Sequence, residues 1–148
     1  MKRVLTLLLL VAICCSEVAA QKLPDEDGRT PALEFSYFPH RQYAFVWRNW
    51  SVVEKGKLAE ILGTTVENVE ALATSMGLPK KQTIEKEWAT HRGYITVLRR
   101  NWHLLPYEQI LQLLGMSREE LKFRLVEDDF LYVKLGNVKP YCQTLRYE

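Results

Sequence analysis

The sequence has little of what metal sites and catalytic sites usually require. Its 148 residues include three cysteines and three histidines, with no Cys-x-x-Cys and no histidine pair at helical spacing. A zinc site is therefore not expected. No glycine-rich phosphate loop precedes a predicted helix, and no serine lies in a nucleophile elbow. We expect no cofactor, no metal and no catalytic set of residues.

An excess of charge of one sign is also missing. The chain has 20 Lys and Arg residues against 18 Asp and Glu residues, for a formal net charge of +2. A protein that binds nucleic acid or an anionic membrane through electrostatics is normally more basic. We therefore expect no nucleic-acid partner.

The first 20 residues have the three parts of a secretory signal peptide. Lys2 and Arg3 precede an uncharged apolar run at residues 4–13, and small residues stand at Ala19 and Ala20. The run is about half the roughly 20 residues that a membrane-spanning helix needs. We expect cleavage after Ala20 and a secreted or periplasmic protein of bacterial export.

Two of the three cysteines lie within this predicted signal. Cys14 and Cys15 leave open the alternative of a lipoprotein anchored through one of them. If the signal is removed, only Cys142 remains and no intramolecular disulfide can form. The domain would then depend on its apolar core.

The expected organisation has three parts. Residues 1–20 are the signal, and residues 21–34, which are polar and contain Pro24 and Gly28, are predicted to be a flexible linker. Residues 35–148 are predicted to form one domain made of two repeats, at about 43–79 and 94–136.

The repeat is visible as a constant spacing of 52 residues. An Arg-Asn-Trp corner occurs twice, and each copy is followed 13 residues after its tryptophan by a glycine. A constant spacing predicts one backbone path used twice. The corner residues are Arg48, Asn49, Trp50 and Gly63 in the first copy, and Arg100, Asn101, Trp102 and Gly115 in the second. We expect the tryptophans to occupy equivalent buried or half-buried positions, and the arginines to bind main-chain carbonyls or carboxylates.

Short strands are predicted ahead of each corner and near the end. Tyr43, Phe45 and Trp47 alternate as in a strand, and residues 94–98 and 130–135 are also β-type. Helices are predicted after each corner, with a glycine ending the first helix and a Thr or Ser capping the next. The fold class is therefore α+β, mainly helical, with two pseudo-symmetric strand–helix–turn–helix repeats.

The aromatic residues offer a candidate partner surface. Rings can stack on sugars, or they can pack in a core, and the sequence leaves both open. The candidates for a glycan or protein surface are Tyr37, Tyr43, Trp47 and Trp88.

Two alternative functions depend on other patterns. Glu127, Asp128 and Asp129 form an acidic cluster that a small carboxylate-based hydrolase could use, although such enzymes need two carboxylates facing each other across a cleft. The helix–glycine–helix spacing is also typical of a helix-turn-helix DNA-binding protein. Residues 65–79, which would include the recognition helix, contain no Lys or Arg, which argues against this alternative.

Residues 100–109 (RNWHLLPYEQ), 113–115 (LLG) and 127–136 (EDDFLYVKLG) resemble a module of exported bacterial proteins, chiefly from Bacteroidota. There the module stands between a signal peptide and a larger glycoside-hydrolase-like region, and the resemblance covers about residues 45–147. It implies a non-catalytic accessory domain linked to glycan use. We therefore expect an exported accessory or interaction module and not an enzyme.

Overall fold

The structure is a computed structural model that describes residues 21–84, 92–128 and 130–148. These residues are mainly helical, as predicted. In chain order the helices are α1 (Arg41–Asn49), α2 (Lys55–Leu62), α3 (Val66–Ser75), α4 (Gly93–Asn101), α5 (Tyr107–Leu114), α6 (Arg118–Phe123), the π-helix η2 (Arg124–Asp128) and α7 (Leu131–Lys134).

The three predicted strands are wrong, because each of these segments is helical. In α1, the buried side chains include those at positions 42, 45, 46 and 49, which is the spacing of one helix face. Position 49 is an asparagine, so the apolar residues alone did not show the helical period. The alternating aromatics suggested a strand instead. Residues 94–98 belong to α4, and α7 takes up most of residues 130–135. Within the described ranges, β-type pairing is limited to one isolated parallel bridge between Pro31 and Tyr141.

The helix ends follow the predicted local chemistry. Gly63 and Gly115 end α2 and α5 in the left-handed conformation, with φ of 66° and 64°. That conformation is costly for other residues and cheap for glycine. Thr65 then caps α3 and Ser117 caps α6, each accepting a hydrogen bond from the main-chain N–H three residues on.

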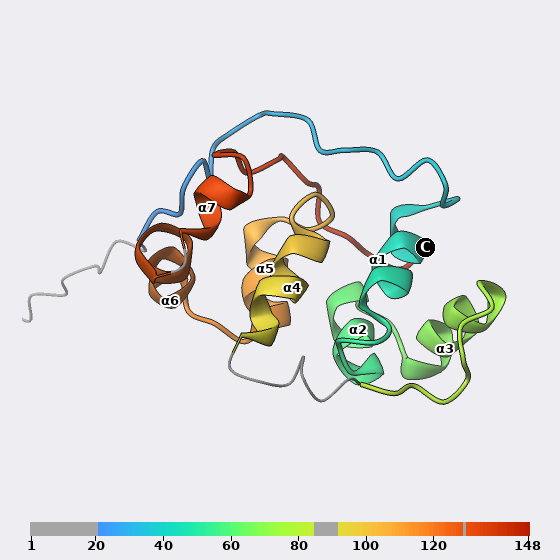
Figure 1. Ribbon diagram of the computed structural model, residues 1–148. Coiled ribbons are helices and arrows are strands. Elements are labelled where there is room, and N and C mark those ends of the chain that lie inside the picture. Colours follow the sequence, from blue (N-terminus) through green and yellow to red (C-terminus); the bar gives the residue numbers. More distant parts are fainter. Residues whose placement is uncertain (1–20, 85–91, 129) are drawn as a thin grey trace, which may run out of the picture.

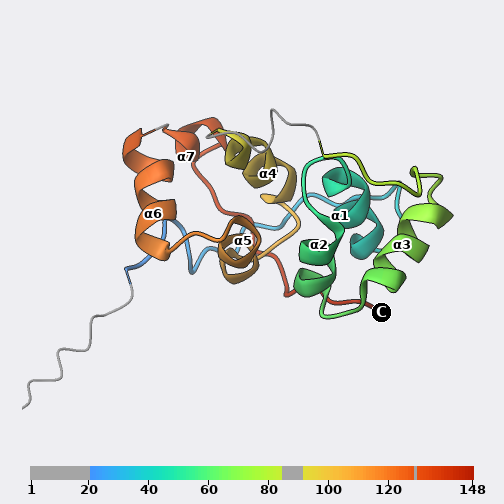
Figure 2. The same cartoon turned by 90° about the horizontal axis from the view of Figure 1, so that it is seen from below.

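The two halves of the chain lie at opposite ends of the molecule. Helices α1, α2 and α3 gather at one end, and α5, α6 and α7 occupy the other, with α4 beside α5 (Figure 1; Figure 2). Helix α1 packs against α4, and α2 packs against α5. Both bounds of α4 and α5 lie 52 positions after those of α1 and α2. Buried apolar side chains from both halves form one continuous core.

Residues 21–34, which the sequence predicts to be a flexible linker, make contacts with the rest of the chain. They lie on the second half of the molecule, where the Leu23 side chain is only 2% exposed. The Tyr107 hydroxyl donates a hydrogen bond of 2.7 Å to the Pro24 carbonyl. These contacts join the segment to residues that lie far along the sequence.

The other end of the chain crosses in the opposite direction. After passing the second half, the C-terminal segment reaches the first half. There the Tyr147 N–H donates to the Leu62 carbonyl at 2.9 Å. The side-chain amide of Gln42 both donates to and accepts from the main chain of Glu148. The N-terminal segment therefore begins on the second half, while the C-terminal segment finishes on the first (Figure 1).

Candidate functional site

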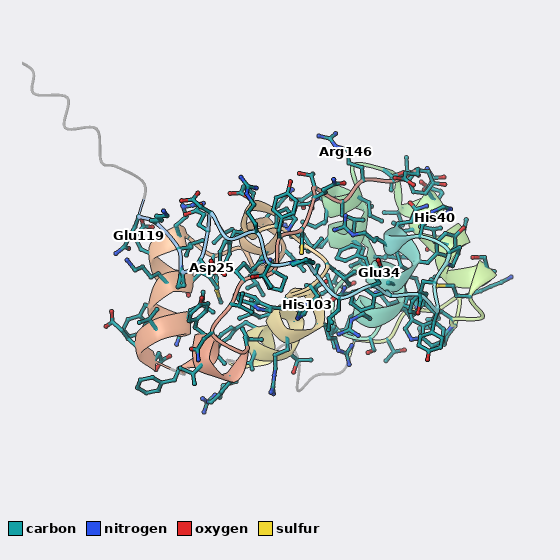
Figure 3. All side chains as sticks on the ribbon, turned by 90° about the horizontal axis from the view of Figure 1, so that it is seen from above. Asp25, Glu34, His40, His103, Glu119 and Arg146 are labelled. Atoms are coloured by element: carbon teal, nitrogen blue, oxygen red, sulfur yellow. The ribbon has the colours of Figure 1, made fainter. Side chains whose placement is uncertain are left out.

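A groove of about 760 Å³ is formed by residues from both ends of the described chain. One wall is formed by residues 31–36 and 38–42, and the other by residues 141–146 with Glu148. His103, from the turn between α4 and α5, also lines it. In Figure 3 the N-terminal segment runs from Asp25 past His103 to Glu34 and His40. The groove is thus built from the two crossing end segments of the chain.

His103 holds one wall of this groove in place. The Leu33 N–H donates to His103 Nδ1 at 3.1 Å, so Nδ1 is the acceptor and the neutral ring carries its proton on Nε2. Partial burial, followed by the charges of Lys139 and Arg48, lowers the pKa of His103 below its usual value. The neutral ring is the form that this contact requires.

Arg41 joins the groove to the interior. Its guanidinium donates to the Leu104 carbonyl and, at 3.0 Å, to the Gln143 carbonyl. These contacts fix the C-terminal wall against the turn that carries His103. Among the described residues, no hydrogen bond joins a Ser, Thr or Cys side chain to a histidine. His103 and Arg41 are thus both engaged in holding the walls of the groove.

A buried lysine lies next to the groove. Lys139 is 4% exposed, and its ammonium donates to the carbonyls of Trp102 (3.1 Å), Leu105 (3.0 Å) and Pro140 (2.8 Å). Burial lowers its pKa, although the neighbouring Cys142 opposes the shift. Burial likewise raises the pKa of the Cys142 thiol, which favours the unreactive protonated form. This cluster anchors the C-terminal segment to the corner of the second half.

The corner residues that the repeat singled out are brought together at the contact between the halves. Arg48 Nε donates to the Arg100 carbonyl at 2.8 Å, and Arg100 Nη1 donates to the Arg48 carbonyl at 2.5 Å. The side-chain amides of Asn49 and Asn101, both fully buried, donate to each other's oxygen at 2.9 and 2.7 Å. Burial, and then the charge of Arg100, lowers the pKa of Arg48. These residues hold the halves together.

The two corner tryptophans are both buried but differ in one contact. Each follows the last residue of its helix, α1 or α4, with nearly the same backbone angles. Trp102 Nε1 donates to the Val138 carbonyl at 2.9 Å. Trp50 Nε1 has no hydrogen-bond partner among the described residues.

The candidate aromatic surface is only partly assembled. Tyr37 is 97% exposed and Trp47 is 47% exposed, whereas Tyr43 is half-buried and packs against the core. Phe38 lines the groove, and its ring lies 6.3 Å from that of Trp47. Trp88 lies outside the described residues. Phe38 therefore connects the groove to the exposed ring of Trp47 on α1.

The residues behind the two alternative functions lie apart from the groove. Asp128 pairs with Arg124 one helical turn earlier, and Glu127 is exposed. Asp129 lies outside the described residues. On α3, the exposed positions include Glu67 and Ala71, so the outward face of the would-be recognition helix is not basic.

Within residues 21–84, 92–128 and 130–148, no three His, Cys, Asp or Glu side chains are grouped as a metal site would require. None of the helices described has the length and apolar character needed to cross a bilayer. Comparison of the chain with protein-family models, curated proteins and solved structures found no match.

Three polar residues that hold the corners and the two halves in place were not anticipated from the sequence. Gln82 donates to the carbonyls of Trp50 and Val53 at the first corner. Lys139 does the same for the carbonyls of Trp102 and Leu105 at the second corner. Gln109 bridges the halves by donating to the carbonyls of Ile61 and Leu145. Gln109 could have been noticed in the sequence, because it is a polar residue at an apolar position of α5. Gln82 and Lys139 lie in loops and gave none.

Proposed function

We propose that this chain is an exported, non-catalytic accessory module that binds a glycan presented to or by a larger glycan-degrading protein. The observation that carries the proposal is the continuity between the groove and the exposed ring of Trp47, through Phe38, with the exposed Tyr37 next to Phe38 in the chain. A groove of this size that joins exposed aromatic rings to polar groups is suited to a sugar chain, which has both apolar faces and hydroxyls.

The organisation of the groove supports binding over catalysis. His103 and Arg41 are engaged with main-chain groups that fix its walls. The acidic cluster that a hydrolase would use lies on η2, outside the residues that line the groove. A glycan would therefore meet a surface whose walls are already held in place.

We also infer that the two halves are copies of one unit related by a pseudo-twofold axis. The equal spacing of their helix bounds supports this, as do the reciprocal bonds between Arg48 and Arg100 and between Asn49 and Asn101. Reciprocal contact of equivalent residues is the pattern expected at a twofold interface. In this view the repeat builds the scaffold, and the crossing end segments add the groove.

Glycan-array and pull-down binding tests the proposal. Trp47→Ala and Tyr37→Ala should each weaken binding to any glycan that the unaltered protein retains, because each removes an exposed ring beside the groove. Phe130→Ala is the matched control, since Phe130 is an exposed ring on the second half. Binding that survives the loss of both Trp47 and Tyr37 would count against sugar stacking.

Export is proposed on the sequence pattern alone and has its own test. The mature protein recovered from the producing bacterium should begin at Gln21, as read by N-terminal sequencing. Incorporation of labelled fatty acid would instead indicate the lipoprotein alternative at Cys14 or Cys15.

A further inference from the structure

The indole N–H of Trp50 is a buried donor without a partner among the described residues. The Trp50 side chain is only 5% exposed. Leaving such a donor unpaired costs about 1–3 kcal/mol, so most buried polar groups in folded proteins are bonded. An unpaired donor of this kind requires an explanation from its surroundings.

Trp50 lines a cavity of about 560 Å³ beside α3. The other lining residues include Ala71, Ala73 and Thr74 of α3, with Lys80 from the segment that follows it. The volume lies within the range of about 300–1,000 Å³ that is usual for small-ligand sites. Helix α3 and the segment after it lie at the end of the molecule farthest from α6, on the outside (Figure 1; Figure 2).

The second half shows what the equivalent tryptophan binds. There, Lys139 donates to the carbonyls of Trp102 and Leu105, and the residue before it, Val138, accepts the Trp102 indole N–H through its main-chain carbonyl. An extended segment of the same chain thus supplies both the donor for the corner carbonyls and the acceptor for the indole.

The first half has only one of these two contacts. Gln82 donates to the carbonyls of Trp50 and Val53, which lie 52 positions before those of Trp102 and Leu105. No described residue supplies the acceptor that Val138 provides in the other half. Within the described residues, one corner is therefore complete and the other lacks an acceptor for its indole N–H.

We propose that the cavity beside Trp50 binds a partner polypeptide through a main-chain carbonyl, which takes the place that Val138 occupies at Trp102. The inference rests on the proposed function as an interaction module and adds a second, peptide-binding site to it. The carbonyl enters between α3 and the segment that carries Lys80. Small side-chain adjustments of the kind common at protein interfaces then bring it to the indole.

The test uses the purified protein and a peptide with the sequence of residues 137–141, acetyl-Asn-Val-Lys-Pro-Tyr-amide. The indole resonances of the 15N-labelled protein are followed during titration, and the Trp50 signal is assigned by its loss in Trp50→Phe. We expect a saturable shift of the Trp50 resonance. A second peptide, in which an alkene replaces the Val–Lys amide, lacks the acceptor carbonyl and should bind about tenfold more weakly.

A matched pair of surface variants locates the site without disturbing the core. Ala71→Arg places a large side chain at the cavity from an exposed position and should abolish the shift. Phe123→Arg, 52 positions later on the second half and also exposed, should leave it unchanged.

Three results would overturn the proposal: no shift at millimolar peptide, equal binding of both peptides, or a Trp50 shift with maltose in place of peptide. If the glycan binding that depends on Trp47 persists in any of these cases, only the peptide site is lost and the proposed function stands.

Discussion

The buried amide pair between the halves gives the sharpest test of the structure. Asn49 and Asn101 are fully buried, and each donates one N–H to the other's oxygen and one to a carbonyl of its own helix. Replacing Asn49 with leucine keeps the approximate shape but leaves Asn101 with an unpaired oxygen and an unpaired N–H. Asn101→Leu likewise leaves Asn49 with an unpaired oxygen and an unpaired N–H.

The magnitude follows from counting the orphaned groups. Each buried, unpaired polar group costs about 1–3 kcal/mol, so two orphaned groups should lower the free energy of unfolding by about 2–6 kcal/mol. That is a large share of the roughly 5–15 kcal/mol that stabilises a typical domain. The double variant leaves no orphaned amide, so it should be more stable than either single variant, with a coupling of at least about 2 kcal/mol.

Urea unfolding of the four proteins in this cycle, followed by tryptophan fluorescence, measures these costs. Gln112→Leu is a control, because Gln112 bonds to Glu60 across the same halves but is exposed. It should change the free energy of unfolding by less than about 0.5 kcal/mol. Additive costs for the two asparagine replacements would refute the reciprocal pairing.

Three further outcomes are expected from the same unfolding assay. Lys139→Met removes the donor for three carbonyls and should cost about 3 kcal/mol or more. Because folding lowers the pKa of His103, the unfolded chain binds more protons between that lowered value and about 6.5, so stability should fall as the pH falls through this window. His103→Gln, which can still accept from Leu33, should flatten that dependence, and an unchanged profile would contradict the assignment. Gly63→Ala and Gly115→Ala should each cost about 1–2 kcal/mol through backbone strain, since the space around both glycines is open.

Local chemistry in the sequence predicted the parts of the fold that depend on a few neighbouring residues. The glycines at 63 and 115 end helices, and Thr65 and Ser117 cap the next ones. These features are readable because backbone angles and caps are decided within one helical turn. The constant spacing of 52 residues likewise identified both Arg-Asn-Trp corners.

The features that were missed depend on contacts between distant segments. The alternation of Tyr43, Phe45 and Trp47 indicated a strand, because the buried Asn49 that completes the helix face is polar. Its partner lies 52 residues away, which no local pattern reports. The groove was also beyond prediction, because its walls come from the two ends of the chain and meet only when both ends fold back.

The crossing of the two ends has a mechanical consequence. A load that pulls residues 21 and 148 apart acts first on the two end segments. The N-terminal segment is bound to the second half, and the C-terminal segment is bound to the first half. The bonds from Pro24 to Tyr107 and from Tyr147 to Leu62 would therefore bear the load before the junction between the halves does. Force applied through a tether at either end would therefore separate the walls of the groove while the helices stay folded.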